Sequence, residues 1–207
     1  MLENFPNLGY LLDDVPQNIL DRLNKEVSSL DDTASKANNT LAGNIKQEYF
    51  LDTSRSIVEP YVLDLLNRYN DGYGILTSLD VMSAGNPQPV KLGPLWVNFQ
   101  EKGEFNPHHK HSGVMSFVIW LKVPFDIRKE ENESPGIYSN TNSAGCFEFI
   151  YSDILGHTQN YQIPVDKSFE GKILMFPNKL MHGVYPFFSS NEYRISVAGN
   201  ILMDIPE

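Results

Sequence analysis

The chain has 207 residues, 41% of them hydrophobic, so it is long and apolar enough to fold as one domain around a substantial core. Its formal net charge of −10 disfavours duplex nucleic acid and anionic membranes as partners, because both are bound through basic surfaces, although one buried arginine could still hold a small anion. The lone Cys146 excludes an internal disulfide. No apolar run reaches the roughly 18 residues of a membrane helix, and MLENFPNLGYLLDD lacks signal-peptide features, so we expect a cytoplasmic protein.

The first third of the chain is expected to be helical. A first helix should follow Pro16, which an early helical position tolerates, because apolar residues then recur at helical spacing: Ile19, Leu20, Leu23, Val27 and Leu30. After the polar loop DDTASKANNT, a second helix should begin near Ser54 or Ser56 and end at NDGYG. Its apolar face should consist of Val58, Tyr61, Val62, Leu65, Leu66 and Tyr69. Such faces are typical of helices that pack on a sheet.

From about residue 75 the apolar pattern becomes that of β-strands. Clusters of Asn, Gly, Pro and Ser separate eight apolar or alternating runs, at 75–82, 95–100, 113–123, 146–153, 160–165, 172–177, 182–188 and 193–202. Successive strands without helices between them predict an antiparallel double sheet, such as a jelly roll or a related barrel. The 113–123 run is apolar on both faces and should be a central strand.

The chain shows no clean domain boundary. We therefore expect a single domain, 1–207, in which residues 1–74 give helical support to a β core formed by 75–207. The polar insertion 128–145 should form either a mobile lid or a surface loop. Apolar residues that face inward on the central strand, such as Met115 and Phe117, would help to exclude water from the interior.

Three of the five histidines lie in NPHHKHSG, residues 106–113. On an extended strand, His109 and His111 would point to one side, because side chains alternate with a period of two, and His108 would point to the other. We interpret His109 and His111 as candidate metal ligands, and His108 as a partner behind them or a surface residue. If this loop is irregular, His108 and His111 could form the pair instead.

A third metal ligand would have to come from elsewhere in the sheet. His157 lies in ILGHTQN, which is typical of an exposed hairpin turn. His182 lies in FPNKLMHGVYPF, where a strand begins after a loop, and a strand end is a reasonable place for a ligand. Glu101 and Glu104 are the nearest carboxylates that could replace a histidine.

The last predicted strand offers a candidate anion site. Arg194 and Ser196 share one face of it by the period-two rule. Burying a guanidinium in an apolar interior is costly without an anion, and a carboxylate matches its parallel N–H groups. Alternatively, Arg194 lies at a rim and pairs with a local acid. Asn98 and Asn106 could orient a ligand or line the pocket, or serve only as turn residues.

The order of these motifs resembles the iron(II)- and 2-oxoglutarate-dependent oxygenase superfamily, in its prolyl-4-hydroxylase-like branch. The resemblance covers roughly residues 95–201 and rests on three segments in the right order: FQEKGEFNPHHKH, GKILMFPNKLMHGVYPF and YRISVAGNI. It implies a mostly β protein with N-terminal helices, built on a double-stranded β-helix (jelly-roll) core. It also implies an enzyme that uses Fe(II) and 2-oxoglutarate.

Carried over by position, the resemblance makes His109, His111 and His182 iron ligands. It makes Arg194, helped by Ser196, the residue that binds the distal carboxylate of 2-oxoglutarate. Such a dioxygenase would hydroxylate a substrate, here an unidentified peptide side chain or small molecule, and release succinate and CO2. Most of the superfamily has Asp or Glu where this chain has His111, although phage-encoded relatives resemble it there. Three imidazoles also suit zinc, copper and nickel.

Two other functions remain open from the sequence. A cupin-like metalloenzyme that does not use 2-oxoglutarate would keep the three histidines but give Arg194 no special task. A non-catalytic jelly-roll module, such as a virion protein, would need none of these residues, and their presence in register argues against it. Succinate formation with iron(II) and 2-oxoglutarate would separate the three hypotheses.

Overall fold

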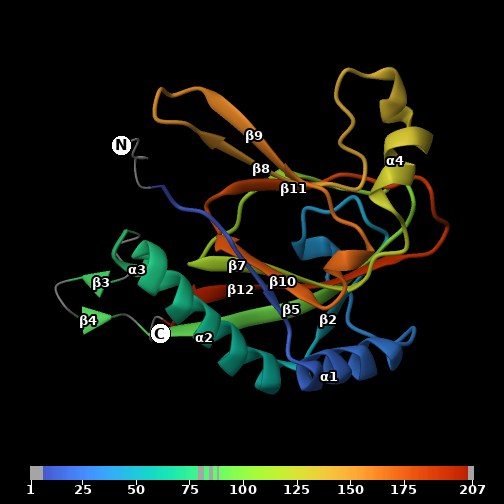
Figure 1. Ribbon diagram of the computed structural model, residues 1–207. Coiled ribbons are helices and arrows are strands. Elements are labelled where there is room, and N and C mark those ends of the chain that lie inside the picture. The colour runs from blue at the N-terminus through green and yellow to red at the C-terminus, as the bar shows by residue number, and fades with distance from the viewer. Residues whose placement is uncertain (1–6, 79–81, 84–85, 88, 205–207) are drawn as a thin grey trace.

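The computed structural model describes residues 7–78, 82–83, 86–87 and 89–204, and its core consists of two antiparallel sheets (Figure 1). The larger sheet has the strand order β1-β10-β7-β12-β5-β2, with β1 Leu11–Asp14, β10 Lys172–Pro177, β7 Met115–Lys122, β12 Arg194–Met203, β5 Val90–Gln100 and β2 Gln47–Leu51. The smaller sheet has the order β6-β11-β8-β9, with β6 Asn106–His109, β11 Met181–Val184, β8 Phe147–Ser152 and β9 Thr158–Ile163. A separate pair joins β3 Met82–Ser83 and β4 Asn86–Pro87.

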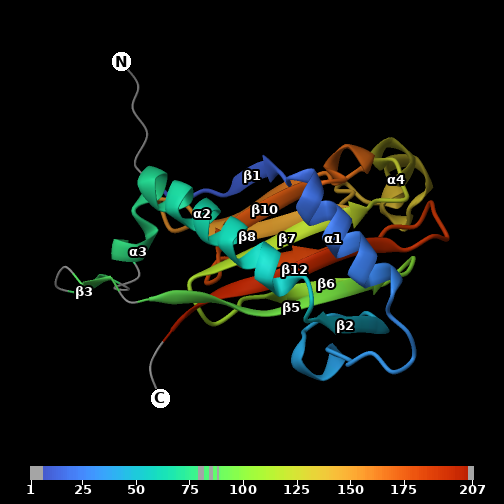
Figure 2. The same ribbon diagram turned by 90° about the horizontal axis from the view of Figure 1, so that it is seen from below.

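Two long helices cover the outer face of the larger sheet, as Figure 2 shows from below. Helix α1, Gln17–Ser28, begins directly after Pro16, and α2, Arg55–Tyr73, occupies the stretch that the apolar pattern predicted. Gly74 ends α2 with a φ of 63°, a left-handed conformation that glycine adopts without strain. None of the helices within the described residues is long and apolar enough to cross a membrane.

Strand β7 lies inside the larger sheet, between β10 and β12, which confirms the predicted central strand. Its alternating side chains serve two cores. Met115, Phe117 and Ile119 pack in the core that includes the helices, whereas Trp120 belongs to the aromatic core that also contains Phe147 of the smaller sheet. The strand is apolar on both faces because both faces are buried.

The fold is mostly β, with antiparallel sheets arranged as in a jelly roll and helices packed outside them. Over the described residues, no ladder joins the larger sheet to the smaller one, so the core is an open double sheet rather than a closed barrel.

Several elements differ from the sequence-based expectation. The region expected to be helical also contributes β1 and β2, which form the two edges of the larger sheet. Residues Ile75–Ser78, expected to begin a strand, form the short helix α3, because an apolar run of this length does not distinguish helix from strand. The rest of that expected strand, 79–81, lies outside the described residues, and its last residue, Met82, belongs to β3.

Helix α4, Ile127–Glu133, begins one residue before the polar insertion 128–145, which also forms a 3-10 turn, Pro135–Tyr138. Other 3-10 turns lie at Asn38–Thr40 and Lys167–Phe169. In Figure 1, α4 and the β8–β9 hairpin project from the same side of the double sheet.

Candidate functional site

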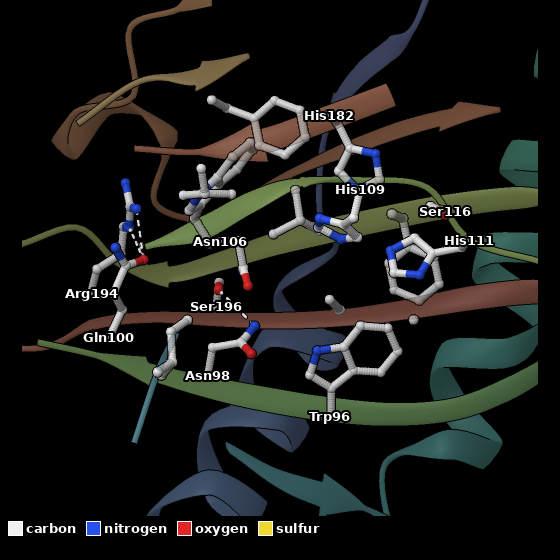
Figure 3. A pocket seen from close by; sticks show the side chains of 18 of the residues that line it. Trp96, Asn98, Gln100, Asn106, His109, His111, Ser116, His182, Arg194 and Ser196 are labelled. Carbon is white, nitrogen blue, oxygen red and sulfur yellow. Dashed lines mark hydrogen bonds between the residues drawn. The ribbon is translucent and has the colours of Figure 1, made fainter. Parts of the chain in front are cut away.

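The structure brings His109, His111 and His182 together at one end of the space between the sheets (Figure 3). Their potential ligand atoms all lie within 4.8 Å of one another. His109 ends β6 and is the register partner of His182 on β11, so sheet pairing sets their approach. His111 lies beyond the end of β6, where its backbone N–H donates to the carbonyl of Asn178 at 2.9 Å.

Backbone carbonyls fix the orientation of two of these imidazoles. Nδ1 of His109 lies 2.7 Å from the carbonyl of Pro107, and Nδ1 of His182 lies 2.9 Å from that of Leu180. A carbonyl only accepts hydrogen bonds, so Nδ1 carries the proton in both rings and Nε2 keeps the lone pair that a metal requires. This arrangement is the usual support for a metal-binding histidine.

Burial keeps the three imidazoles neutral. Desolvation, with smaller contributions from neighbouring imidazoles, lowers the pKa of all three rings, to about 4 for His111 and to about 3 for His182. At neutral pH all three rings are therefore unprotonated at one nitrogen. The donor set, three neutral imidazoles, fits Fe(II) as well as zinc, copper or nickel.

The other candidate ligands lie away from this cluster. His108 faces the opposite side of β6, where its Nε2 donates to the carboxylate of Glu148 at 2.7 Å. His157 is exposed beside Asp153. Glu104 accepts from the backbone N–H groups of Lys46 and Glu101, and Glu101 pairs with the ammonium of Lys46 at 2.6 Å. The alternative ligand sets considered from sequence are therefore not assembled.

A buried network supports β6 from behind. Glu148, on β8, accepts from His108, from the hydroxyl of Tyr185 at 3.1 Å and from the amide of Gln162 at 2.9 Å. Gly183 makes room for the imidazole, since a Cβ there would lie 2.8 Å from Cδ2 of His108. Sequence reasoning missed Glu148, which alternates with the core residues Phe147 and Phe149 in the run CFEFIYSD and so faces away from the cavity.

Arg194 lies at the other end of the same cavity and is 2% exposed. Its Nε and Nη2 donate to Oε1 of Gln100 at 3.0 and 2.6 Å, its Nη1 to the carbonyl of Gly145 at 3.1 Å, and its Nη2 to the carbonyl of Tyr185 at 3.0 Å. The guanidinium carbon also lies 5.6 and 5.7 Å from the ring centres of Phe125 and Phe187. Arg194 is thus buried inside the protein and not at a rim.

Ser196 and two asparagines line the cavity between its two ends (Figure 3). Nδ2 of Asn98 donates to Oγ of Ser196 at 3.3 Å, while Oδ1 of Asn98 is buried without a hydrogen-bond partner. Asn106 lies at the start of β6 and also lines the cavity. A buried polar atom without a partner is costly, so this acceptor marks a place where a ligand or water is expected.

The cavity is narrow, about 60 Å³, and none of the described residues that line it is Asp or Glu. On β7, its walls include Ser116, Val118 and Trp120, whose side chains face away from the helices, together with Phe117. Met115 packs in the helix-covered core and does not line the cavity, so the prediction that it would face the interior of the double sheet is wrong. For a chain with a net charge of −10, a cavity wall without a carboxylate is a notable local exception.

The insertion 128–145 is anchored next to Arg194. Glu130 is fully buried, and its carboxylate accepts from the backbone N–H groups of Phe188 at 2.7 Å and Ser189 at 2.8 Å. The insertion ends at Gly145, whose carbonyl binds Arg194 and whose φ of 77° favours glycine. A Cβ at this position would lie 2.7 Å from the ring of Phe125. The insertion is therefore joined to the cavity rather than only covering the surface.

Comparison with known proteins agrees with this geometry. Residues 94–200, more than half of the chain, match the family model described as "Putative 2OG-Fe(II) oxygenase". No curated protein matches the chain.

Solved structures with a similar fold include three enzymes of low sequence identity. A prolyl-4-hydroxylase from Pseudomonas putida has a TM-score of 0.57 at 15% identity, over 95% of this chain and 94% of that one. A viral collagen prolyl hydroxylase from Paramecium Bursaria Chlorella virus-1, solved with 2OG, has a TM-score of 0.51 at 12% identity, over 93% of this chain and 94% of that one. HygX from Streptomyces hygroscopicus, solved with nickel, 2-oxoglutarate and hygromycin B, has a TM-score of 0.53 at 11% identity, over 96% of this chain and 84% of that one.

The similarity to solved structures supports the fold, and the family match covers residues 94–200, which include most of the cavity wall. Both agree with the resemblance found from the motifs, and they favour an enzyme over a non-catalytic jelly-roll module. The chain belongs to the 2OG-Fe(II) oxygenases, enzymes that use iron(II) and 2-oxoglutarate.

Proposed function

We propose that the protein is a hydroxylase in which His109, His111 and His182 hold Fe(II), and Arg194 with Ser196 binds the distal carboxylate of 2-oxoglutarate. The observation that carries this proposal is a single cavity with three converging neutral imidazoles at one end and a buried guanidinium at the other. The cupin-like alternative would leave that guanidinium without a task.

Iron(II) with 2-oxoglutarate supplies the oxidising chemistry: dioxygen and the co-substrate give succinate and CO2, and one oxygen atom enters a C–H bond of the substrate. The residues of the chain bind and orient. The carbonyls of Pro107 and Leu180 hold two imidazoles with Nε2 free for the metal. Arg194 supplies positive charge where a carboxylate would lie, and aromatic walls such as Trp120 and Phe147 exclude water.

The three-histidine set changes the charge balance of this site. Neutral ligands leave the full +2 charge of the metal uncompensated until an anion binds, whereas a carboxylate ligand would remove one unit. With Arg194, the cavity would hold three positive charges and no described carboxylate. A dianionic co-substrate is the ligand that such a cavity favours most.

The substrate that we propose is a peptide side chain or a small molecule. Of the three similar structures described above, two are named as prolyl hydroxylases and one was solved with hygromycin B, so both classes occur on this fold. The acidic composition of the chain disfavours duplex nucleic acid.

The test is an anaerobic titration of 2-oxoglutarate into the iron(II)-loaded protein, followed by metal-to-ligand charge-transfer absorption. We expect saturable absorption with iron(II), none with zinc, and none with glutarate, which lacks the keto group. Exposure to air should then yield succinate, and a screen of peptides and small molecules should raise its rate. Iron binding without charge-transfer absorption or succinate would contradict the proposal.

A further inference from the structure

Arg194 is held by neutral acceptors. Its four hydrogen bonds go to one side-chain amide, that of Gln100, and to the backbone carbonyls of Gly145 and Tyr185. A guanidinium has five N–H donors, so one N–H, on Nη1, is left for a ligand. The nearby acid Glu130 is occupied by backbone N–H groups of the 188–189 loop. Among the described residues, the charge of Arg194 is therefore fixed in place without a bonded counterion.

Within the part of the chain that the structure describes, Gln100 is the one side chain that hydrogen-bonds this guanidinium. It is the register partner of Arg194 across the β5–β12 ladder, and it is 3% exposed. Its Oε1 accepts from both Nε and Nη2, while its Nε2 donates to the carbonyl of Glu104 at 2.5 Å. Because the amide is bonded on both sides, its oxygen is held at the edge of the guanidinium that a carboxylate would otherwise occupy.

We propose that Gln100 is a positioning residue for the anionic co-substrate: it orients Arg194 as a carboxylate would, but leaves its positive charge for the ligand. This inference rests on the proposed function of the cavity. A glutamate of almost the same shape could accept the same two hydrogen bonds, yet it would neutralise the guanidinium. The neutral amide of Gln100 fixes the orientation of the guanidinium and leaves its positive charge uncompensated.

Burial makes the uncompensated charge of Arg194 energetically costly. Burial lowers the pKa of Arg194 to about 10, so the group stays protonated at neutral pH although its charge is poorly solvated. A buried charge without a counterion is costly, and an incoming carboxylate removes that cost. The empty protein thus holds a destabilised charge that ligand binding stabilises.

Two variants of one residue separate this role from a structural one. Gln100→Glu keeps the acceptor but adds a charge, whereas Gln100→Met keeps the shape and removes the acceptor. Both variants lose the N–H that bonds the Glu104 carbonyl, so the difference between them reports on the acceptor and the charge. If Gln100 preserves the charge of Arg194, the affinity for 2-oxoglutarate should fall in the order wild type, Gln100→Met, Gln100→Glu, with a loss of roughly 100-fold or more for Gln100→Glu. If Gln100 is only structural, Gln100→Glu should bind nearly as wild type and Gln100→Met should be the weaker variant.

Stability supplies a readout with the opposite order of the two variants. In the ligand-free protein, Gln100→Met should lower the melting temperature more than Gln100→Glu does, because both variants lose the N–H that bonds the Glu104 carbonyl but only the glutamate gives the buried guanidinium a counterion. Gln47→Glu is the matched control, since it makes the same substitution on β2, at a residue outside the cavity wall whose amide bonds Tyr193 and not Arg194. If Gln47→Glu weakens 2-oxoglutarate binding as much as Gln100→Glu does, the effect is one of general charge and the inference is overturned.

An experiment on the metal-free protein tests the role of Gln100 separately from the proposed oxygenase function. Glutarate, a dicarboxylate without the keto group, should stabilise the metal-free wild type against heat and should not stabilise Gln100→Glu. If this difference holds but iron(II) and 2-oxoglutarate give no succinate, the role of Gln100 stands and the oxygenase proposal falls. If glutarate stabilises both proteins equally, Gln100 has no such role, whatever the iron-loaded enzyme does.

Discussion

The two ends of the cavity are built by different kinds of contact. At the histidine end, the carbonyls that orient His109 and His182 come from residues only two positions earlier in the chain. At the arginine end, the contacts of Arg194 reach Gln100, 94 residues away, and Gly145, 49 residues away. At the first end each of these rings is oriented by its own segment and one ladder brings the two segments together, whereas at the second end distant segments orient the side chain itself.

This difference suggests how the two ends should respond to change. Removing a metal ligand should destroy metal binding and leave the sheets intact, because backbone ladders hold the strands that carry His109 and His182, and His111 lies beyond the end of β6. Removing Arg194 should affect anion binding and also loosen the segments that meet there, those ending at Gly145 and beginning at Tyr185. Variants at each end can test this separation.

The largest effect is expected for His182→Ala. His182 is 4% exposed and provides one of three ligands, so metal affinity should fall by more than the roughly 10- to 100-fold that loss of an outer partner costs. Equilibrium dialysis with iron(II) measures this, and circular dichroism should show intact sheets. The matched control His157→Ala alters an exposed histidine and should bind iron normally. Near-normal iron affinity in His182→Ala would refute this ligand set.

Arg194→Ala should act at the other end. Losing one partner of a buried, charge-assisted pair costs about 2–5 kcal/mol, so 2-oxoglutarate affinity should fall ~30-fold to several thousand-fold while iron affinity changes little. Arg194→Lys should recover only part, because an ammonium cannot replace the planar guanidinium. The exposed Arg68, paired with Asp13, gives the control Arg68→Ala. If wild type and Arg194→Ala titrate alike, the anion end is misassigned.

His108→Ala tests whether the support behind β6 matters to the metal. The change removes the hydrogen bond to Glu148 without touching a proposed ligand. We expect iron affinity to fall about 10-fold, the lower end of the range for partners outside the ligand set, with 2-oxoglutarate affinity of the iron-loaded protein unchanged. Unchanged iron affinity would show that β6 is held by its ladder with β11 alone.

Ser196→Ala should have the smallest effect. A single neutral hydrogen bond is worth about 0.5–1.5 kcal/mol, so 2-oxoglutarate affinity should fall only a few-fold while Arg194 keeps its charge. The same titration measures it. A loss as large as that of Arg194→Ala would mean that the hydroxyl, rather than the guanidinium, is the main anion contact.

The contrast between the two ends also explains what the sequence could predict. Strand periodicity and motif order predicted the candidate metal ligands His109, His111 and His182, and the structure brings these three side chains together. The central strand and both long helices follow from apolar periodicity in the same way. These signals are local or repeat in a known order.

The missed features depend on tertiary contacts. Gln100 ends a strand and looks like an ordinary polar residue until its register partner is known to be Arg194. Glu130 lies among many charged residues of a polar insertion, and only the fold shows that it is buried. Strands β1 and β2 are short edge strands, and the pairing that defines them involves β10 and β5, far away in the sequence.

The absence of Asp and Glu from the described cavity wall has a kinetic consequence for a chain of net charge −10. An anionic co-substrate approaches through a repulsive field and finds attraction only inside, whereas a metal cation is drawn in from a distance. The association rate of 2-oxoglutarate should therefore rise with salt while that of iron(II) falls, because exposed charges are screened beyond ~10 Å at 0.1 M ionic strength. Stopped-flow mixing at several salt concentrations would measure both rates. This field favours loading of the metal before the co-substrate.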